Sequence, residues 1–122
     1  MDKRPIRSHR DLDVWRAGMR LRNRVARIVR TLPREERWEI GVQTRKSAQS
    51  IPANVAEGHQ RPGRQDYKQF VSISRGSAGE LDTHLIAIWS DHPELRRPIK
   101  HALKILDDVS RMLKNLHRSL SQ

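Results

Sequence analysis

The chain has 122 residues with a net charge of +11, and only 35% of them are hydrophobic, so we expect one domain with a modest core. The absence of cysteine excludes a disulfide scaffold and thiolate chemistry. No run approaches the roughly 20 apolar residues of a membrane span, and the N-terminus lacks the apolar core of a signal peptide, so we expect a soluble, cytoplasmic protein.

The chain begins with a basic tail, residues 1–10, and a first helix is expected over about residues 11–31. Two largely apolar rows at three- and four-residue spacing run along this helix. One row is Leu12, Trp15, Met19, Arg22, Ala26 and Val29, and the other is Val14, Gly18, Leu21, Val25, Ile28 and Leu32. A helix in a monomeric bundle needs one broad stripe. The two rows therefore indicate contact with another protomer, unless they merge into one wide buried face.

A second helix is expected over about residues 34–57, with many small residues on its inner side. Small residues fit a place where a neighbouring backbone comes close. Pro52 should kink the helix or make it restart after Ser50, because proline lacks a backbone N–H. Gly58 is the expected end of the helix, so residues 58–64 are predicted to form a loop.

Two further helices are expected over about residues 65–89 and 94–120. The core row of the third helix is Tyr67, Val71, Ser74, Ala78, Leu81, Leu85 and Ile88. The row of the fourth is Leu95, Ile99, Ala102, Leu106, Val109, Leu113, Leu116 and Leu120. Alternating four- and three-residue steps are typical of a long helix-packing seam, and no alternating strand pattern occurs. The sequence predicts an all-α protein, an antiparallel up-down four-helix bundle over residues 11–120.

The second and third helices carry polar residues where a core helix usually has apolar ones. These residues are Arg45, Asn54, Glu57, Ser77, Glu80 and His84. If the two helices are antiparallel neighbours, the six side chains are expected to meet in one buried layer, with arginine against carboxylate. We interpret the layer as structural. The alternative is a ligand-binding or catalytic pocket, but no nucleophile–base spacing accompanies it.

Several short motifs give the chain a family resemblance. They are Leu12-x-x-Trp15, Pro33 with Glu35-Glu36, Gln43-x-Arg45-Lys46-Ser47, Ser50-Ile51-Pro52-x-Asn54-Val55-Ala56-Glu57-Gly58, Tyr67-x-x-Phe70 and Gly76-Ser77-x-x-Glu80-Leu81. From about Asp11 to Ile88 the chain resembles the four-helix bundle proteins encoded in intervening sequences of bacterial 23S ribosomal RNA genes. The string from Ser50 to Gly58 is the most specific part. Gly63 and Asp66 depart from the family pattern without affecting the fold.

The resemblance implies a ring-like homo-oligomer, with a pentamer favoured. It also implies a likeness to the accessory proteins that partner reverse transcriptases in diversity-generating retroelements. A reverse transcriptase or an RNA-processing element is therefore an expected partner.

Metal, cofactor and catalytic sites are not predicted. No two of the six histidines are three or four residues apart, and the Glu-x-x-His motif of ferritin-like metal sites is absent. His84 follows Glu80 by four residues, which supplies two ligands at most. Walker-type and dinucleotide-binding glycine patterns are also absent.

Positive charge gathers at the two ends of the chain. Residues 1–30 hold ten Lys and Arg against three Asp, and residues 91–122 hold seven against four acidic residues. The first helix carries the row Arg16, Arg20, Arg24 and Arg27. The last helix carries Arg97, Lys104, Arg111 and Arg118 at seven-residue spacing, with Lys100 and Lys114 nearby. Each set is expected on one helix face.

These basic rows favour contact with the phosphate backbone of RNA or DNA, because arginine matches phosphate geometry bidentately. The alternative is a solvated face. With five aromatic residues and no helix-turn-helix or zinc finger, neither base stacking on a dedicated surface nor sequence-specific contact is expected. The leading hypothesis is a non-enzymatic, self-associating, phosphate-binding protein. A protein-interaction scaffold is the rival, and an enzyme comes third.

Overall fold

The computed structural model describes residues 5–122, and these residues form helices and turns without any strand. In chain order the elements are the 3-10 turn η1 (His9–Asp11), α1 (Asp13–Arg30), the short α2 (Arg34–Trp38), α3 (Ile40–Gln60), α4 (Arg64–Asp91), the 3-10 turn η2 (Pro93–Leu95) and α5 (Arg96–Leu120). The prediction of an all-α protein is confirmed. No helix in the described range is long and apolar enough to cross a membrane.

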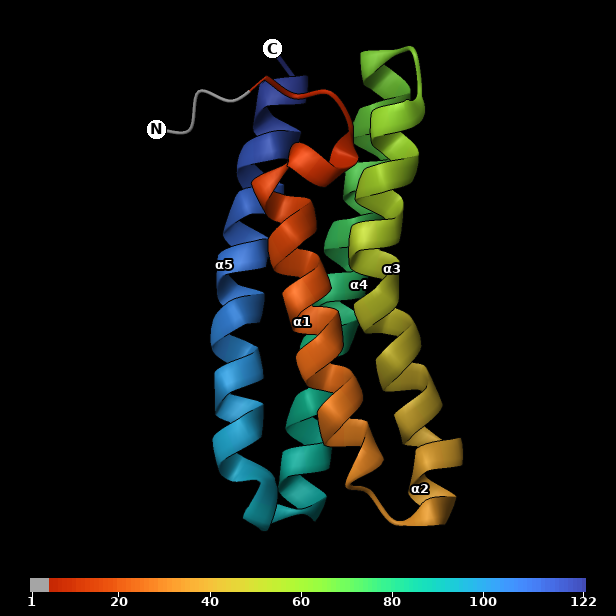
Figure 1. Cartoon of the computed structure of the whole chain (residues 1–122), viewed down its shortest axis with the longest axis vertical. Coiled ribbons are helices and arrows are strands. Elements are labelled where there is room, and N and C mark those ends of the chain that lie inside the picture. The colour runs from red at the N-terminus through yellow and green to blue at the C-terminus, as the bar shows by residue number, and fades with distance from the viewer. Residues whose placement is uncertain (1–4) are drawn as a thin grey trace.

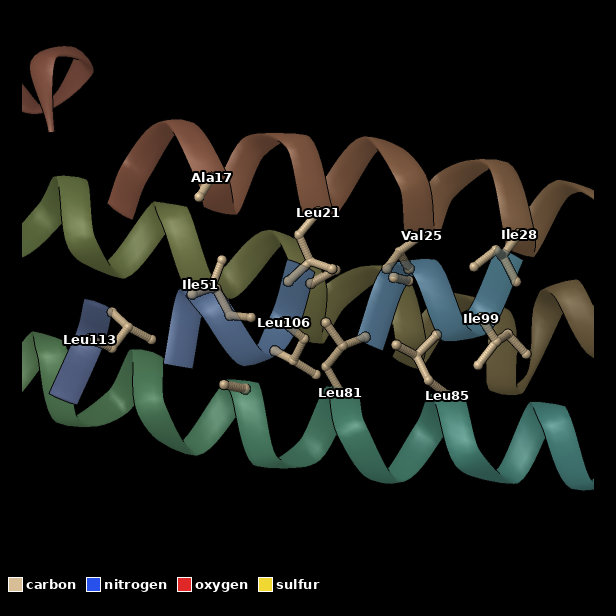
Figure 2. Packing of buried hydrophobic residues seen from close by; sticks show 14 of the residues in the cluster. Ala17, Leu21, Val25, Ile28, Ile51, Leu81, Leu85, Ile99, Leu106 and Leu113 are labelled. Atoms are coloured by element: carbon tan, nitrogen blue, oxygen red, sulfur yellow. The ribbon is translucent and has the colours of Figure 1, made fainter. Parts of the chain in front are cut away.

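The four long helices lie side by side, and successive ones run in opposite directions (Figure 1). α1 contacts α3 and α5, and α4 contacts the same two helices. The predicted rows of α4 and α5 face the centre: Leu81, Leu85, Ile99 and Leu113 are fully buried. Figure 2 shows these side chains pointing toward Leu21 and others from α1 in one core.

The two apolar rows of α1 are buried to different extents within the chain. The row containing Leu21 and Val25 is buried in the core. The row containing Trp15 and Met19 is half-buried, and these two side chains line a shallow hollow beside Pro52 of α3. The second row is therefore only partly covered within the chain, and its contact with another protomer stays a prediction.

The described part of the expected N-terminal tail contains a local hydrogen-bonded turn. Residues 1–4 lie outside the described part of the chain. The Ser8 side chain accepts a hydrogen bond from the Arg10 N–H, and the Asp11 carboxylate accepts one from the Ser8 N–H at 3.1 Å. This capping box begins η1 directly before α1.

Of the two effects expected of Pro52, a kink or a restart after Ser50, the restart is wrong, because α3 continues through Pro52. Pro52 is buried against α1, where a β-carbon added to Gly18 would lie 3.4 Å from the Pro52 β-carbon. Carbonyls in this turn also accept side-chain hydrogen bonds. Asn54 Nδ2 donates to the Ser50 carbonyl at 2.8 Å, and Ser74 Oγ donates to the Ile51 carbonyl at 2.8 Å. Proline at position 52 removes a single backbone donor, so the helix continues through it with the ring packed against Gly18.

Gly58 does not end α3, which runs to Gln60, so the predicted loop shrinks to residues 61–63. Gly58 is buried, and a β-carbon there would lie 2.8 Å from Tyr67 Cδ1 and 2.9 Å from Phe70 Cβ. Its role is therefore to let the first turns of α4 approach α3 closely.

The helix expected over residues 34–57 is interrupted at Glu39, whose φ of −106° and ψ of −95° are not helical. The preceding α2 is tied to the turn between α4 and α5. His92 Nε2 lies 2.8 Å from Glu36 Oε1, and His92 Nδ1 lies 3.2 Å from Glu94 Oε2. The imidazole thus bridges two carboxylates from separate parts of the chain.

Candidate nucleic-acid interface

The arginine row of α1 lies on the exposed side of that helix. Its four- and three-residue spacing sets it opposite the core row, so Arg16, Arg20, Arg24 and Arg27 are all exposed. Arg16 is held locally, since its Nε donates to the Arg10 carbonyl at 2.8 Å and it lies 3.8 Å from Asp11. Within residues 5–122 the other three form no ion pair. Three guanidinium groups are therefore available to an external anion.

A groove of about 390 Å³ lies between α1 and α5, and we call it the arginine groove. Its lining residues are Arg20, Asn23, Arg24, Arg27, His101 and Ile105. No carboxylate belongs to this lining. The groove therefore offers positive charge and amide donors without an internal counter-ion.

The basic row of α5 is exposed but does not line the arginine groove. Arg97, Lys100, Lys104, Arg111, Lys114 and Arg118 all lie on the solvent side. Arg111 pairs with Asp108 at 2.9 Å. Arg111 and Lys114 line a different hollow, of about 550 Å³ between α4 and α5, which also contains Asp82 and Asp107. The two predicted rows thus belong to neighbouring surfaces, and only the α1 row lines a groove without acids.

Three basic residues of α4 were missed by the sequence reading. Arg64 donates to the Ser119 carbonyl at 2.6 Å, which brings the start of α4 to the end of α5. The pKa of His117 is lowered by burial and by the nearby charges of Arg75 and Lys68. The positively charged side chains of Arg64, Lys68 and Arg75 therefore lie near the C-terminal part of α5. The spacing Arg64, Lys68, Arg75 was a usable signal, but nearby acids keep the middle of the chain almost neutral.

The predicted polar layer is formed only in part. Ser77 Oγ lies 2.7 Å from Ser50 Oγ, and Asn54 Nδ2 donates to Ser50 Oγ at 2.8 Å. Asn54 and Ser77 thus meet through Ser50, a residue that the prediction did not include. His84 is half-buried on the same side of α4.

The charged members of that layer are not buried within this chain. Arg45, Glu57 and Glu80 are exposed, and Glu57 pairs with Arg61 at 2.9 Å. The expected contact of arginine with carboxylate across the two helices is therefore absent from the described residues. Charged groups keep their hydration at these positions, which avoids the cost of burying them.

No group of three or more His, Cys, Asp or Glu in residues 5–122 is arranged to hold a metal ion. Comparison with known proteins gives one family match. A family model described as the 23S rRNA-intervening sequence protein matches residues 10–115. No curated protein matches the chain.

Proposed function

The chain belongs to the family of 23S rRNA-intervening sequence proteins, and from that premise we propose that it is a non-enzymatic protein that binds nucleic acid through phosphate contacts. The observation that carries the proposal is the arginine groove. Arg20, Arg24 and Arg27 line it without a carboxylate, and none of them has an ion-pair partner in residues 5–122.

The energetics of the α1 row support an external anion. Like charges four residues apart destabilise a helix by about 0.2–0.5 kcal/mol per pair. Both the Arg16–Arg20 and the Arg20–Arg24 pairs have this spacing. A phosphate chain removes that repulsion and gains charge-assisted, bidentate hydrogen bonds. Arg20 to Arg27 spans about 10 Å along the helix axis, enough for two or three phosphates of one strand.

We also propose that the chain assembles with copies of itself. The unit is an antiparallel up-down four-helix bundle that associates into a ring-like homo-oligomer, with a pentamer favoured by the family resemblance. Ile73 and Ile86 of α4, 51% and 48% exposed, are apolar side chains that another protomer would cover. A reverse transcriptase or an RNA-processing element is the proposed protein context, in the cytoplasm.

A salt titration of binding to unrelated RNA and DNA oligonucleotides tests the function. For phosphate contacts, log affinity falls linearly with log salt, with a slope of about 0.7 per contact on single strands and about 0.9 on duplexes. R20Q/R24Q should flatten the slope by about two contacts, whatever the base sequence. A matched control, R7Q/R96Q, removes two exposed arginines that form no ion pair within residues 5–122 and do not line the groove, and it should leave the slope nearly unchanged.

Two outcomes would overturn the proposal. Absence of binding to any oligonucleotide at low salt would leave a protein-interaction scaffold as the better explanation. Strong preference for one base sequence would show that contacts to base edges, and not phosphates alone, govern binding.

A further inference from the structure

The most exposed large apolar side chain of the described residues is Trp38, the last residue of α2, which is 73% exposed. The other two tryptophans, Trp15 and Trp89, are half-buried and pack against the core. An indole ring contributes a large apolar surface that is usually covered. We therefore expect a ligand or a partner molecule to cover the Trp38 side chain.

A hollow of about 310 Å³ lies beside Trp38 at the end of the molecule where α2 lies (Figure 1). Its charged lining consists of four arginines from three helices: Arg30 of α1, Arg34 and Arg37 of α2, and Arg45 of α3. On α2 the spacing of three and four residues sets Arg34, Arg37 and Trp38 on one face. The indole ring and the guanidinium groups thus share one concave site.

The carboxylates nearby leave these arginines without an internal partner. Glu36 contacts His92 at 2.8 Å, on the other side of α2. Glu35 and Glu39 are exposed and do not line the hollow. None of the four arginines forms an ion pair within residues 5–122. The site therefore carries a net positive charge that suits an anion.

A second hollow of about 630 Å³ adjoins the first, and Trp38 lines both. It shares Trp38, Val42 and Arg45 with the first, and adds polar side chains of α3 that include Lys46 and Gln49. Amide side chains both donate and accept hydrogen bonds, as the edges of unpaired bases require. Trp38 thus stands between an arginine-lined hollow and an amide-containing one.

We propose that Trp38 is a stacking position for an unpaired base of single-stranded nucleic acid, whose phosphates contact Arg30, Arg34 and Arg37. The inference rests on the proposed function and specifies its ligand class as single strands or loops. An aromatic ring in a positively charged groove is the usual platform for single strands, whereas bases paired in a duplex do not present a free face. The small number of aromatic residues does not prevent base stacking, because a single exposed indole ring among arginines suffices.

A second copy of the chain is the competing occupant. Each copy carries a charge of +11, so covering four unpaired arginines with another copy would require desolvating them without a clear excess of acids. A nucleic acid supplies one negative charge per nucleotide and a ring to stack in the same ligand. The charge of the site therefore favours the nucleic acid.

The test compares three ligands of equal length: a single-stranded RNA, its duplex, and a single-stranded abasic oligonucleotide that keeps the phosphates. Single-stranded RNA should quench tryptophan fluorescence in the full chain, and W38F should remove most of that quenching. W38A should weaken binding of the single strand about tenfold, because stacking on an aromatic side chain is lost. Binding of the duplex and of the abasic oligonucleotide should change little.

I6A is the matched control, since Ile6 is also an exposed apolar side chain and does not line the hollow. It should leave single-strand affinity unchanged, and melting curves should show that every variant folds. If W38A lost the same affinity for the single-stranded RNA as for the abasic oligonucleotide, base stacking on Trp38 would be contradicted.

Unchanged affinity of W38A would likewise overturn stacking while leaving phosphate binding intact. Failure of the unmodified chain to bind any ligand would instead refute the proposed function itself. If W38A alters the mass of the particle by light scattering without altering affinity, the occupant is a second protomer.

Discussion

The α1–α5 side and the α3–α4 side of the molecule use their residues differently. α1 and α5 bury aliphatic side chains such as Val25 and Leu106, and carry rows of Arg and Lys outside. α3 and α4 also bury aliphatic side chains, and in addition they meet through hydroxyl groups, with Ser74 fully buried and bonded to the Ile51 carbonyl. Close backbone approach at Gly58 completes that contact.

The difference separates residues that hold the fold from residues that remain available for binding. On the α3–α4 side, small and polar residues are already used by the neighbouring helix, so substitutions there should act on stability. On the α1–α5 side the arginines contribute little to packing. Substitutions there should act on binding and leave the fold intact.

The largest expected effect concerns the two basic rows. Replacing Arg16, Arg20, Arg24 and Arg27 together with Gln should flatten the salt dependence of nucleic-acid binding by about three to four contacts. The variant R97Q/K104Q/R111Q/R118Q should have a smaller effect, because Arg111 is already paired with Asp108 and this row lies outside the arginine groove. Salt titrations of both variants, with melting curves as a control for folding, make the comparison. Equal effects would show that α1 and α5 form a single binding surface.

On the α3–α4 side, G58A should destabilise the fold by about 1–3 kcal/mol, because the added methyl overlaps Tyr67 and Phe70. The matched control is G79A, at a helical position where an added β-carbon meets no atom within 4 Å. That change should stabilise by about 0.5–1 kcal/mol through helix propensity. Urea unfolding measures both variants. Equal changes in the free energy of unfolding of the two variants would mean that the packing of α3 against α4 does not require close contact at Gly58.

The histidine bridge between α2 and the α4–α5 turn should make stability depend on pH. The pKa of His92 is raised by its hydrogen bond to Glu36, then by the charge of Glu36 and by Glu94, although partial burial opposes this. The stabilisation is complete below the ordinary pKa of about 6.5 and is lost as the pH rises through the elevated value. The free energy of unfolding should therefore fall above pH 6.5, and H92Q should remove this fall.

His117 provides the control of opposite sign. Its pKa is lowered, first by burial and then by Arg75 and Lys68, so protonation costs stability as the pH falls below about 6.5. H117Q should flatten the curve only on that acidic side. A pH dependence above 6.5 that survives in H92Q would exclude the bridge as its source.

The smallest effect is expected at the charged residues that the sequence placed in a buried layer. E80A should change the free energy of unfolding by no more than about 0.5 kcal/mol, because Glu80 is exposed in the chain. Chemical unfolding combined with light scattering checks this. A larger loss accompanied by dissociation would instead place Glu80 at a contact between protomers.

Helix positions and core rows could be predicted because both are local properties. A period of 3.6 residues determines which side chains share a face, so the buried rows of α4 and α5 and the exposed arginines of α1 followed from spacing alone. Composition likewise established the excess of positive charge. The sequence by itself therefore determined the all-α class, the core and the most basic helix face.

The tertiary structure decided which faces meet, because contact between helices depends on their register and on how closely their backbones approach. Gly58 and Pro52 resemble helix breakers, yet packing against Tyr67 and against Gly18 keeps α3 continuous. The same register pairs Ser77 with Ser50 and leaves Glu80 in solvent. The arginines around Trp38 come from three separate helices, so only folding brings their charges together on one exposed ring.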